Sequence, residues 1–168
     1  MSAEEAFLGF GANLPSLAGA PDKTIFAALA ELGRNGVVPL HSSRLYASPA
    51  WPNASDPFFT NAVVRVQTTL SPGSLLALLH ATETAFGRTR SARNAPRPLD
   101  IDILDFNSRI STTPPILPHP RMQERAFVLI PLKEIAKDWR HPVSGRSIDC
   151  LIEALPFEAR ASVIPREA

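Results

Sequence analysis

The sequence predicts an α+β fold with a ferredoxin-like β-α-β-β-α-β core and additional helices towards its C-terminal end. Short stretches in which apolar and polar residues alternate, or apolar stretches that end at a turn, are typical of strands. The segments between them carry apolar residues at helical spacing. The order of these stretches is that of the ferredoxin-like pattern. With 168 residues the chain is long enough to bury one core, so we expect a single domain over 1–168.

The first half of the chain predicts a strand, a helix and a second strand. Residues 6–11 form an apolar stretch that ends in a glycine turn. Residues 21–32 carry apolar side chains at helical spacing, with Pro21 suited to the first turn and Gly33 to the stop. Residues 37–46 form the second predicted strand.

The second half completes the pattern. Residues 58–68 alternate and predict a third strand, and residues 71–86 predict a helix with Ser71 as N-cap. Residues 101–106 form the fourth strand. Further helices are expected over residues 122–135 and 149–155.

Proline-rich loops separate these elements. The 17 prolines are about twice the usual share for a globular chain. They gather in 49–57, 96–98 and 114–120, which favours ordered, extended loops.

Composition excludes several classes of function. The net charge of +1 does not attract nucleic acid over the whole surface, so a nucleic-acid partner is not expected. Cys150 is the single cysteine, which excludes an intramolecular disulfide framework. The sequence has no 18-residue apolar run and does not begin like a secretory leader. We expect a cytoplasmic monomer with no membrane partner.

The segment from Arg97 to Leu104 carries the strongest functional signal. Asp100 and Asp102 alternate with branched apolar residues, and residues i and i+2 of a strand point to the same face. The two carboxylates therefore stand side by side, roughly 6–7 Å apart at the backbone. Hard cations between them remove their repulsion, and magnesium prefers one or two carboxylates together with substrate phosphates.

Arginines precede this pair with no acidic residue among them. The arginine fork matches phosphate oxygens, so the combination is typical of a polyphosphate site. A solvated arginine loop before an edge strand is the alternative, and local spacing leaves both open. The arginines are Arg88, Arg90, Arg93 and Arg97.

Other motifs are less specific. The stretch from Gly9 to Gly11 lacks the third glycine of a dinucleotide fingerprint, and Gly11 to Asn13 marks a tight turn or a contact with a ligand loop. The sequence contains no P-loop, zinc spacing or GxSxG motif. Phe59 and Asn61 share one strand face that could stack a flat heterocycle and bond its edge, or belong to the core and a turn. A second basic cluster, at Arg121 and Arg125, fits either phosphate or solvent.

Together these motifs resemble the 6-hydroxymethyl-7,8-dihydropterin pyrophosphokinase family of folate synthesis. The most specific match is the run from Arg93 to Leu104, with its Pro-Arg and D-x-D elements. Shorter matches follow the family order, and the resemblance covers about Phe7 to Leu155. The shorter matches are Gly11-Ala12-Asn13-Leu14, Ser48-Pro49, Phe59-Thr60-Asn61-Ala62, Pro118-His119-Pro120-Arg121, Arg125-Ala126-Phe127-Val128-Leu129, Pro131-Leu132 and His141-Pro142.

The resemblance implies transfer of pyrophosphate from ATP to the pterin hydroxymethyl group, with release of AMP. It implies two Mg²⁺ ions on Asp100 and Asp102, with ATP as co-substrate. Catalytic roles are implied for Asp100, Asp102, Arg88 and Arg97. Pterin contacts are implied for Ser48, Pro49, Phe59, Asn61 and Phe127, and ATP contacts for His80, Glu83, Arg90, His119 and Arg125.

Three positions depart from some family members. Asn94 stands where they carry Trp, Phe59 stands where they carry Tyr, and Pro114-Pro115 replaces a basic nucleotide contact. Two other functions stay open at this point. A ferredoxin-like RNA-binding module would need an RNP1-like aromatic strand, which the sequence lacks. A magnesium-dependent nucleotidyl transferase would release pyrophosphate instead of AMP.

Overall fold

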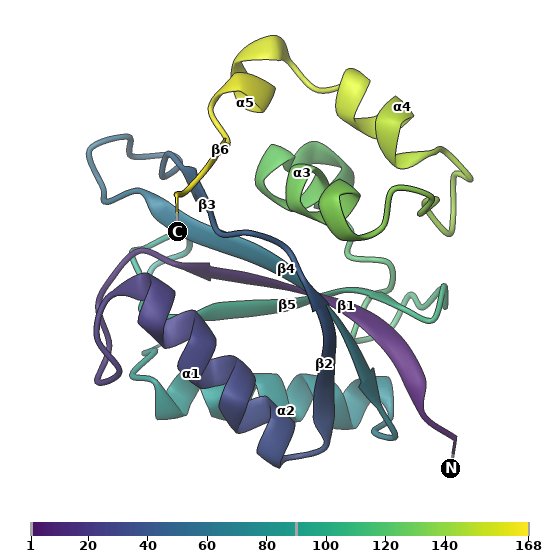
Figure 1. The fold of residues 1–168 in the computed structure, drawn as a ribbon, viewed down its shortest axis with the longest axis horizontal. Helices are drawn as coiled ribbons and strands as arrows, with labels where there is room; N and C mark the ends of the chain where they lie inside the picture. The colour runs from purple at the N-terminus through teal and green to yellow at the C-terminus, as the bar shows by residue number, and fades with distance from the viewer. Residues whose placement is uncertain (1, 90, 168) are drawn as a thin grey trace.

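The computed structural model describes residues 2–89 and 91–167. One antiparallel sheet forms its centre, with the path β5-β1-β4-β3-β6 and with β2 paired to β4 (Figure 1). Long β1 and β4 run side by side, from Glu4↔Thr68 to Ala12↔Thr60. The strands are β1 Glu4–Ala12, β2 Val37–Ser42, β3 Tyr46–Ser48, β4 Phe59–Thr68, β5 Asp100–Phe106 and β6 Ile164–Pro165.

Helices cover both faces of this sheet (Figure 1). The first two lie against one face, and the C-terminal three lie on the other side. The helices are α1 Pro21–Arg34, α2 Pro72–Ala85, α3 Ala126–Ile135, α4 Ile148–Glu153 and α5 Phe157–Ala161, with a 3₁₀ turn η1 at Met122–Glu124. The α+β class predicted from sequence is therefore confirmed.

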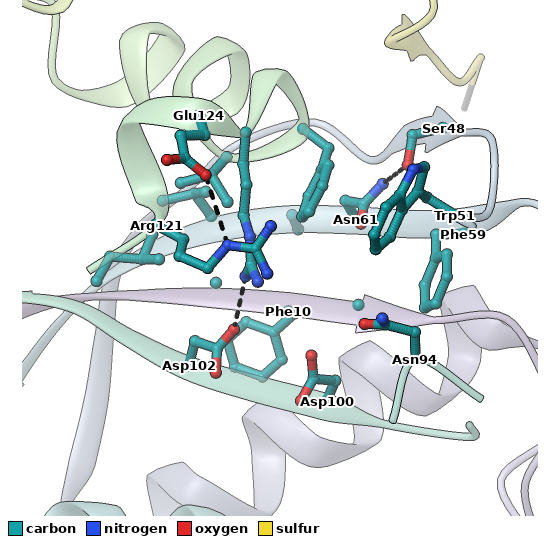
Figure 2. A pocket seen from close by; sticks show the side chains of 18 of the residues that line it. Phe10, Ser48, Trp51, Phe59, Asn61, Asn94, Asp100, Asp102, Arg121 and Glu124 are labelled. Atoms are coloured by element: carbon teal, nitrogen blue, oxygen red, sulfur yellow. Dashed lines mark hydrogen bonds and ion pairs between the residues drawn. The ribbon is translucent and has the colours of Figure 1, made fainter. Parts of the chain in front are cut away.

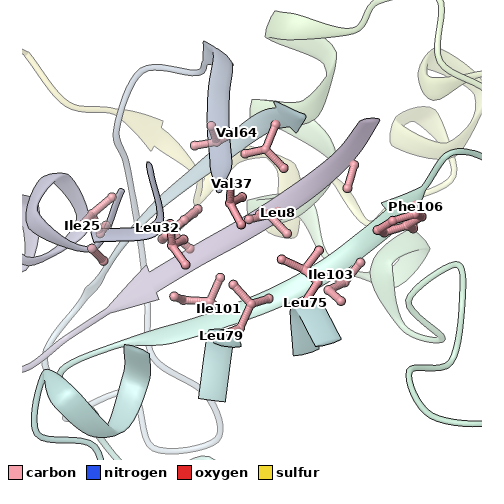
Figure 3. Packing of buried hydrophobic residues seen from close by; sticks show 14 of the residues in the cluster. Leu8, Ile25, Leu32, Val37, Val64, Leu75, Leu79, Ile101, Ile103 and Phe106 are labelled. Atoms are coloured by element: carbon pink, nitrogen blue, oxygen red, sulfur yellow. The ribbon is translucent and has the colours of Figure 1, made fainter. Parts of the chain in front are cut away.

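Two buried cores follow from the strand alternation. In β1, residues at every second position are buried, and Leu8 packs with Ile25 and Leu32 of α1 and Leu75 of α2 (Figure 3). The other core joins Val63, Leu104 and Leu129 beneath α3 and α4. Since both faces are covered, the side chains on the α3 face of β5 lie between the sheet and a helix layer.

A bulge in β5 changes which residues face α3. The β1–β5 register passes from Leu8↔Ile103 to Phe7↔Asp105, so Leu104 is the extra residue. Leu104 joins the α3 core, and buried Asp105 accepts a hydrogen bond from Trp139 Nε1 at 2.8 Å. This bond ties the segment after α3 to the sheet.

The structure adds α5 and β6, which were not predicted, and two predicted elements are broken. The strand expected at 37–46 is two strands, because Ser43 pairs with Val63 through its hydroxyl as well as its backbone and interrupts the ladder. The helix expected at 122–135 breaks at Arg125, which has extended backbone angles (φ −115°, ψ 102°). The chain there passes from η1 into α3.

Among residues 2–89 and 91–167, no helix is long and apolar enough to cross a membrane.

Candidate active site

A cavity of about 310 Å³ opens between the sheet and the first turn of α3 (Figure 2). The strands β1, β4 and β5 form its floor, and the loops that follow β3 and precede β5 form its rim. Most of the predicted site residues meet here although they come from distant parts of the chain. Those lining the cavity are Ser48, Pro49, Phe59, Asn61, Arg97, Asp100, Asp102, Arg125 and Phe127.

Asp100 and Asp102 begin β5 and point from its α3 face into the cavity (Figure 2). Their alternation with buried Leu99, Ile101 and Ile103 fixes this orientation, because the apolar set packs on the opposite face. Burial, and then the charge of Asp100, raises the pKa of Asp102 to about 7. In the free protein the pair therefore holds a proton more readily than two separate carboxyls would.

Arginines surround the two carboxylates. Arg88 Nη1 lies 2.6 Å from Asp100, Arg97 Nη2 lies 3.7 Å from Asp100, and Arg125 Nη1 lies 3.6 Å from Asp102. Burial lowers the pKa of Arg125 from its ordinary value, although Asp102 opposes this shift. The arrangement gives one end of the cavity alternating positive and negative groups, as a magnesium–triphosphate complex requires.

His119 stands beside Asp102, with Nε2 3.8 Å from the carboxylate. Burial lowers the His119 pKa to about 4, and Arg125 acts in the same direction. Its Nδ1 accepts a hydrogen bond from the Arg121 backbone N–H at 3.1 Å. At neutral pH the ring is therefore uncharged and carries its proton on Nε2, so it offers a hydrogen bond rather than an ion pair.

The other end of the cavity combines polar and aromatic groups. Asn61 Nδ2 donates to Ser48 Oγ at 2.7 Å, and both side chains are buried. Arg97 lies over the Phe59 ring at 5.5 Å from its centroid. These groups offer a ring face and an amide edge, which suit a flat heterocycle with polar atoms on its rim.

Some predicted residues lie outside this cavity. Glu83 of α2 is 3% exposed, accepts the Ile101 N–H at 2.8 Å and pairs with Arg88 at 3.0 Å. Glu83 therefore supports the start of β5 from the α2 side of the sheet, opposite the cavity. His80 is exposed on α2, and Arg90 lies outside the described residues.

The arginine loop encloses a smaller cavity of about 230 Å³. Arg88, Arg93 and Arg97 line it, together with Asn94. Asn94 also lines the larger cavity, so the two spaces meet at this residue. Pro114 is exposed, and neither cavity includes it.

Several lining residues were not predicted as site residues. Trp51 and Glu124 also line the larger cavity, as does Arg121, for which the sequence left phosphate and solvent open. Asn13 ties the rim loops of this cavity together. An aromatic residue inside a proline-rich loop was the available signal for Trp51. Nothing in local spacing separates Arg121 and Glu124 from solvent-exposed residues.

The carboxylate pair fits a divalent cation. Two mutually repelling carboxylates, one with a raised pKa, gain from a cation that neutralises both. Within the described part of the chain, no group of three or more His, Cys, Asp or Glu is placed to hold a metal ion. Magnesium that is bound together with substrate phosphates uses one or two protein carboxylates.

The chain is similar to known proteins over most of its length. The family described as "7,8-dihydro-6-hydroxymethylpterin-pyrophosphokinase (HPPK)" matches residues 7–137. A Pseudomonas aeruginosa protein named 2-amino-4-hydroxy-6-hydroxymethyldihydropteridine pyrophosphokinase is 40% identical over 157 residues, covering 92% of this chain and 94% of that protein. A Synechocystis protein of the same name is 38% identical, covering 95% and 80%.

Longer proteins contain a similar segment. A Pneumocystis carinii folic acid synthesis protein is 36% identical over 96% of this chain, which spans 22% of that protein. A solved HPPK-DHPS structure in complex with substrates has a TM-score of 0.68 at 15% identity, covering 92% of this chain and 43% of that one. This structural likeness shows a shared fold. Because the family match and the bacterial relatives both span most of the sequence, this chain belongs to the 7,8-dihydro-6-hydroxymethylpterin-pyrophosphokinase family.

Proposed function

We propose that this cavity transfers pyrophosphate from ATP to the hydroxymethyl group of 6-hydroxymethyl-7,8-dihydropterin and releases AMP. The observation that carries the assignment is the pairing of two ends within one cavity. Asp100 and Asp102 lie among arginines at one end, and the Ser48–Asn61 pair lies beside Phe59 at the other. A polyphosphate and a heterocycle can therefore be held next to each other.

At the phosphate end, we assign Arg88, Arg97 and Arg125 to the triphosphate oxygens. The guanidinium of each arginine lies within 4 Å of an aspartate oxygen. Triphosphate oxygens would therefore compete with the aspartate carboxylates for the same guanidinium groups. Neutral His119 adds a hydrogen-bond donor at Nε2. Positioning and charge neutralisation are the main requirements of phosphoryl transfer, because the protein has little covalent chemistry to perform.

At the heterocycle end, we assign the Phe59 and Phe127 rings to the faces of the pterin. Asn61 and Ser48 then bind its polar edge, with the backbone at Pro49 close by. Because Asn61 and Ser48 already bond each other in the buried wall, their side chains are held in place before the substrate arrives. This preorganisation lowers the entropy cost of binding.

Asp100 and Asp102 are the residues that would hold magnesium, and we propose two ions. When bound, the metal supplies neutralisation of the triphosphate charge and orientation of the transferred group. The two aspartates, for their part, place negative charge on the sheet among the arginines assigned to the triphosphate.

The remaining assignments concern the whole protein. We propose the ferredoxin-like class, which the strand order β5-β1-β4-β2 supports, within a single domain over 1–168. We also propose a cytoplasmic monomer that binds small-molecule substrates. His80 and Arg90 remain proposed ATP contacts.

Product analysis tests the reaction. The protein is incubated with ATP, magnesium and the reduced pterin, and the nucleotides are separated. AMP should form only when all three are present. ADP as the stoichiometric product would contradict pyrophosphoryl transfer. Free pyrophosphate together with AMP joined to the pterin, in place of free AMP, would indicate nucleotidyl transfer.

A further inference from the structure

We infer that Arg166 is a positioning residue that holds β3 and β4 together beneath the heterocycle end of the cavity and thereby sets the affinity for the pterin. This inference rests on the proposed function, because that function assigns the pterin to this end. Arg166 itself does not line the cavity, so its effect must pass through the strands.

The strand that carries Ser48 is short and has a neighbour on each side. β3 has three residues and pairs with β4 at all of them, with Ser48 opposite Phe59. On its other side, β6 pairs with Tyr46 and Ala47 (Figure 1). So short a strand makes few ladder hydrogen bonds to offset the entropy cost of ordering its backbone. The contacts from β6 and the residue after it therefore matter for the position of Ser48.

Arg166 directly follows β6 and joins three strands. Its backbone N–H donates to the Leu45 carbonyl at 2.8 Å, immediately before β3. Its Nη1 donates to Thr60 Oγ1 of β4, also at 2.8 Å. Because β3 lies between β6 and β4 in the sheet, the side chain must cross β3 to reach this hydroxyl. One residue thus ties β6, β3 and β4 together at the same level of the sheet.

The Thr60 side chain points away from the cavity. Its neighbours Phe59 and Asn61 line the cavity, and successive residues of a strand face opposite sides of the sheet. Thr60 is 5% exposed, so water cannot readily replace the guanidinium as its donor. The bond from Arg166 therefore fixes β4 at the position between two side chains that we assign to the pterin.

The phosphate end is held by other elements. Asp100 and Asp102 lie on β5, and β1 and β4 separate that strand from β3. The arginines that face the two carboxylates come from the 87–97 loop and from the start of α3. Loss of the Arg166 bond should therefore weaken pterin binding and leave nucleotide binding unchanged.

Calorimetry measures this selectivity. The protein is titrated with a non-hydrolysable ATP analogue and magnesium, and then, at saturation, with the reduced pterin. Arg166→Ala should weaken pterin binding by about two- to tenfold, the range for loss of one hydrogen bond, with no change for the analogue. Thr60→Val removes the other half of the bond while keeping the side-chain shape, and it should give the same loss. The double variant should lose no more than either single variant.

Two further variants serve as controls. Arg166→Lys keeps a cationic donor and should retain most of the pterin affinity. Arg109→Ala removes another exposed arginine, whose Nη2 lies 2.6 Å from Glu4 at the end of β1 remote from the cavity. Its affinities for both ligands should equal those of the wild type, which distinguishes the Arg166 contact from a general effect of losing a surface ion.

NMR without ligand separates this inference from the proposed function. The side-chain amide of Asn61 bonds Ser48 Oγ in the buried wall, so its proton signals report the geometry between β3 and β4. Arg166→Ala and Thr60→Val should shift these signals and speed their exchange with water, whereas Arg109→Ala should not. This result supports the positioning of Asn61 and Ser48 even if the pterin assignment fails.

Three results would overturn the inference. The first is unchanged pterin affinity in folded Arg166→Ala, and the second is an equal loss of affinity for the ATP analogue. The third is a set of Asn61 side-chain signals that are the same in Arg166→Ala, Thr60→Val and the wild type.

Discussion

Asp102 shows how one residue is tuned by its surroundings. Its carboxyl lies beside Asp100 and against the sheet, and burial raises its pKa to about 7. Arg125 opposes this shift but does not cancel it. The free protein therefore keeps two repelling carboxylates at the position where we propose that a cation binds.

This conflict predicts an unusual pH dependence of stability. The folded pKa of about 7 lies above the value of 3.8 for an ordinary aspartate. The folded state therefore binds more protons between about pH 4 and 7, and stability falls as pH rises through that window. Since the Asp102 side chain is 35% exposed, solvent screening limits the effect to about 1–2 kcal/mol. Urea unfolding of wild type and Asp102→Asn at pH 4.5 and 8 measures it.

Asp102→Asn should remove the decrease in stability between about pH 4 and 7. It should be more stable than the wild type at pH 8 and should lack activity. His119 should affect the pH dependence of stability in the opposite direction to Asp102. The His119 pKa is lowered to about 4, so this residue makes the free energy of unfolding rise with pH from about 4 to 6.5. His119→Asn should therefore enlarge the decrease in stability as pH rises. Equal pH profiles for all three proteins would contradict both assignments.

The aromatic residues predict selective loss of one substrate. Phe59→Ala and Phe127→Ala should weaken pterin binding by about 1–3 kcal/mol, the usual range for base–aromatic stacking, with less effect on ATP. Calorimetric titration of each ligand measures the difference. Phe157→Ala, which removes a ring that is 70% exposed on α5, is the control. Equal losses for pterin and ATP would contradict a pterin-stacking role for the two rings.

At the scale of elements, α2 supports the start of β5. Glu83 is buried between them, accepts the Ile101 N–H and pairs with Arg88, which in turn holds Asp100. One helix carboxylate thus fixes both the strand backbone and the arginine beside the proposed catalytic pair. The charged group is tolerated in the interior because its partners lie within hydrogen-bond distance.

Removing this support should destabilise the protein. Glu83→Ala leaves the Ile101 N–H and the Arg88 guanidinium short of a partner, which should cost about 2–4 kcal/mol of unfolding free energy. Glu83→Gln keeps an acceptor for Ile101 and should lose less. Chemical denaturation compares the variants. A Glu83→Ala protein as stable as the wild type would show that the interaction contributes nothing net.

At the scale of the whole molecule, two loops that are separate in the sequence, 47–57 and 87–97, line the rim of one cavity. The 87–97 loop brings several arginines together, and like charges favour an open arrangement until phosphate is present. Closure over ATP also excludes water, which limits hydrolysis without an acceptor. The rigid sheet beneath holds Asp100 and Asp102 in place during such a movement.

Hydrogen exchange tests this closure. Backbone amides at 91–95 should exchange several-fold more slowly when the magnesium–nucleotide analogue and the pterin are both bound than in the free protein. The central β1 and β4 amides serve as the internal reference. If the 91–95 amides are as protected in the free protein as these strands, the arginines form a fixed cradle and no lid closes.

The sequence by itself determined the order of elements and the strongest part of the site. Alternation placed Asp100 and Asp102 on one face of a strand, because a period of two allows no other result. Local patterns also gave α1 and α2 to within a few residues. These features depend on neighbours along the chain, which the sequence contains directly.

Only the tertiary structure decided which distant residues meet. The break of the strand at Ser43 needs its partner Val63, and the bulge at Leu104 needs the register against β1. In the sequence, Glu83 cannot be distinguished from an exposed residue of a surface helix. Its burial depends on the packing of β5 against α2. The side chain of Asn13 likewise bonds Pro57 and Arg97, which lie 44 and 84 residues away. Such contacts depend on how layers pack, and no local spacing encodes them.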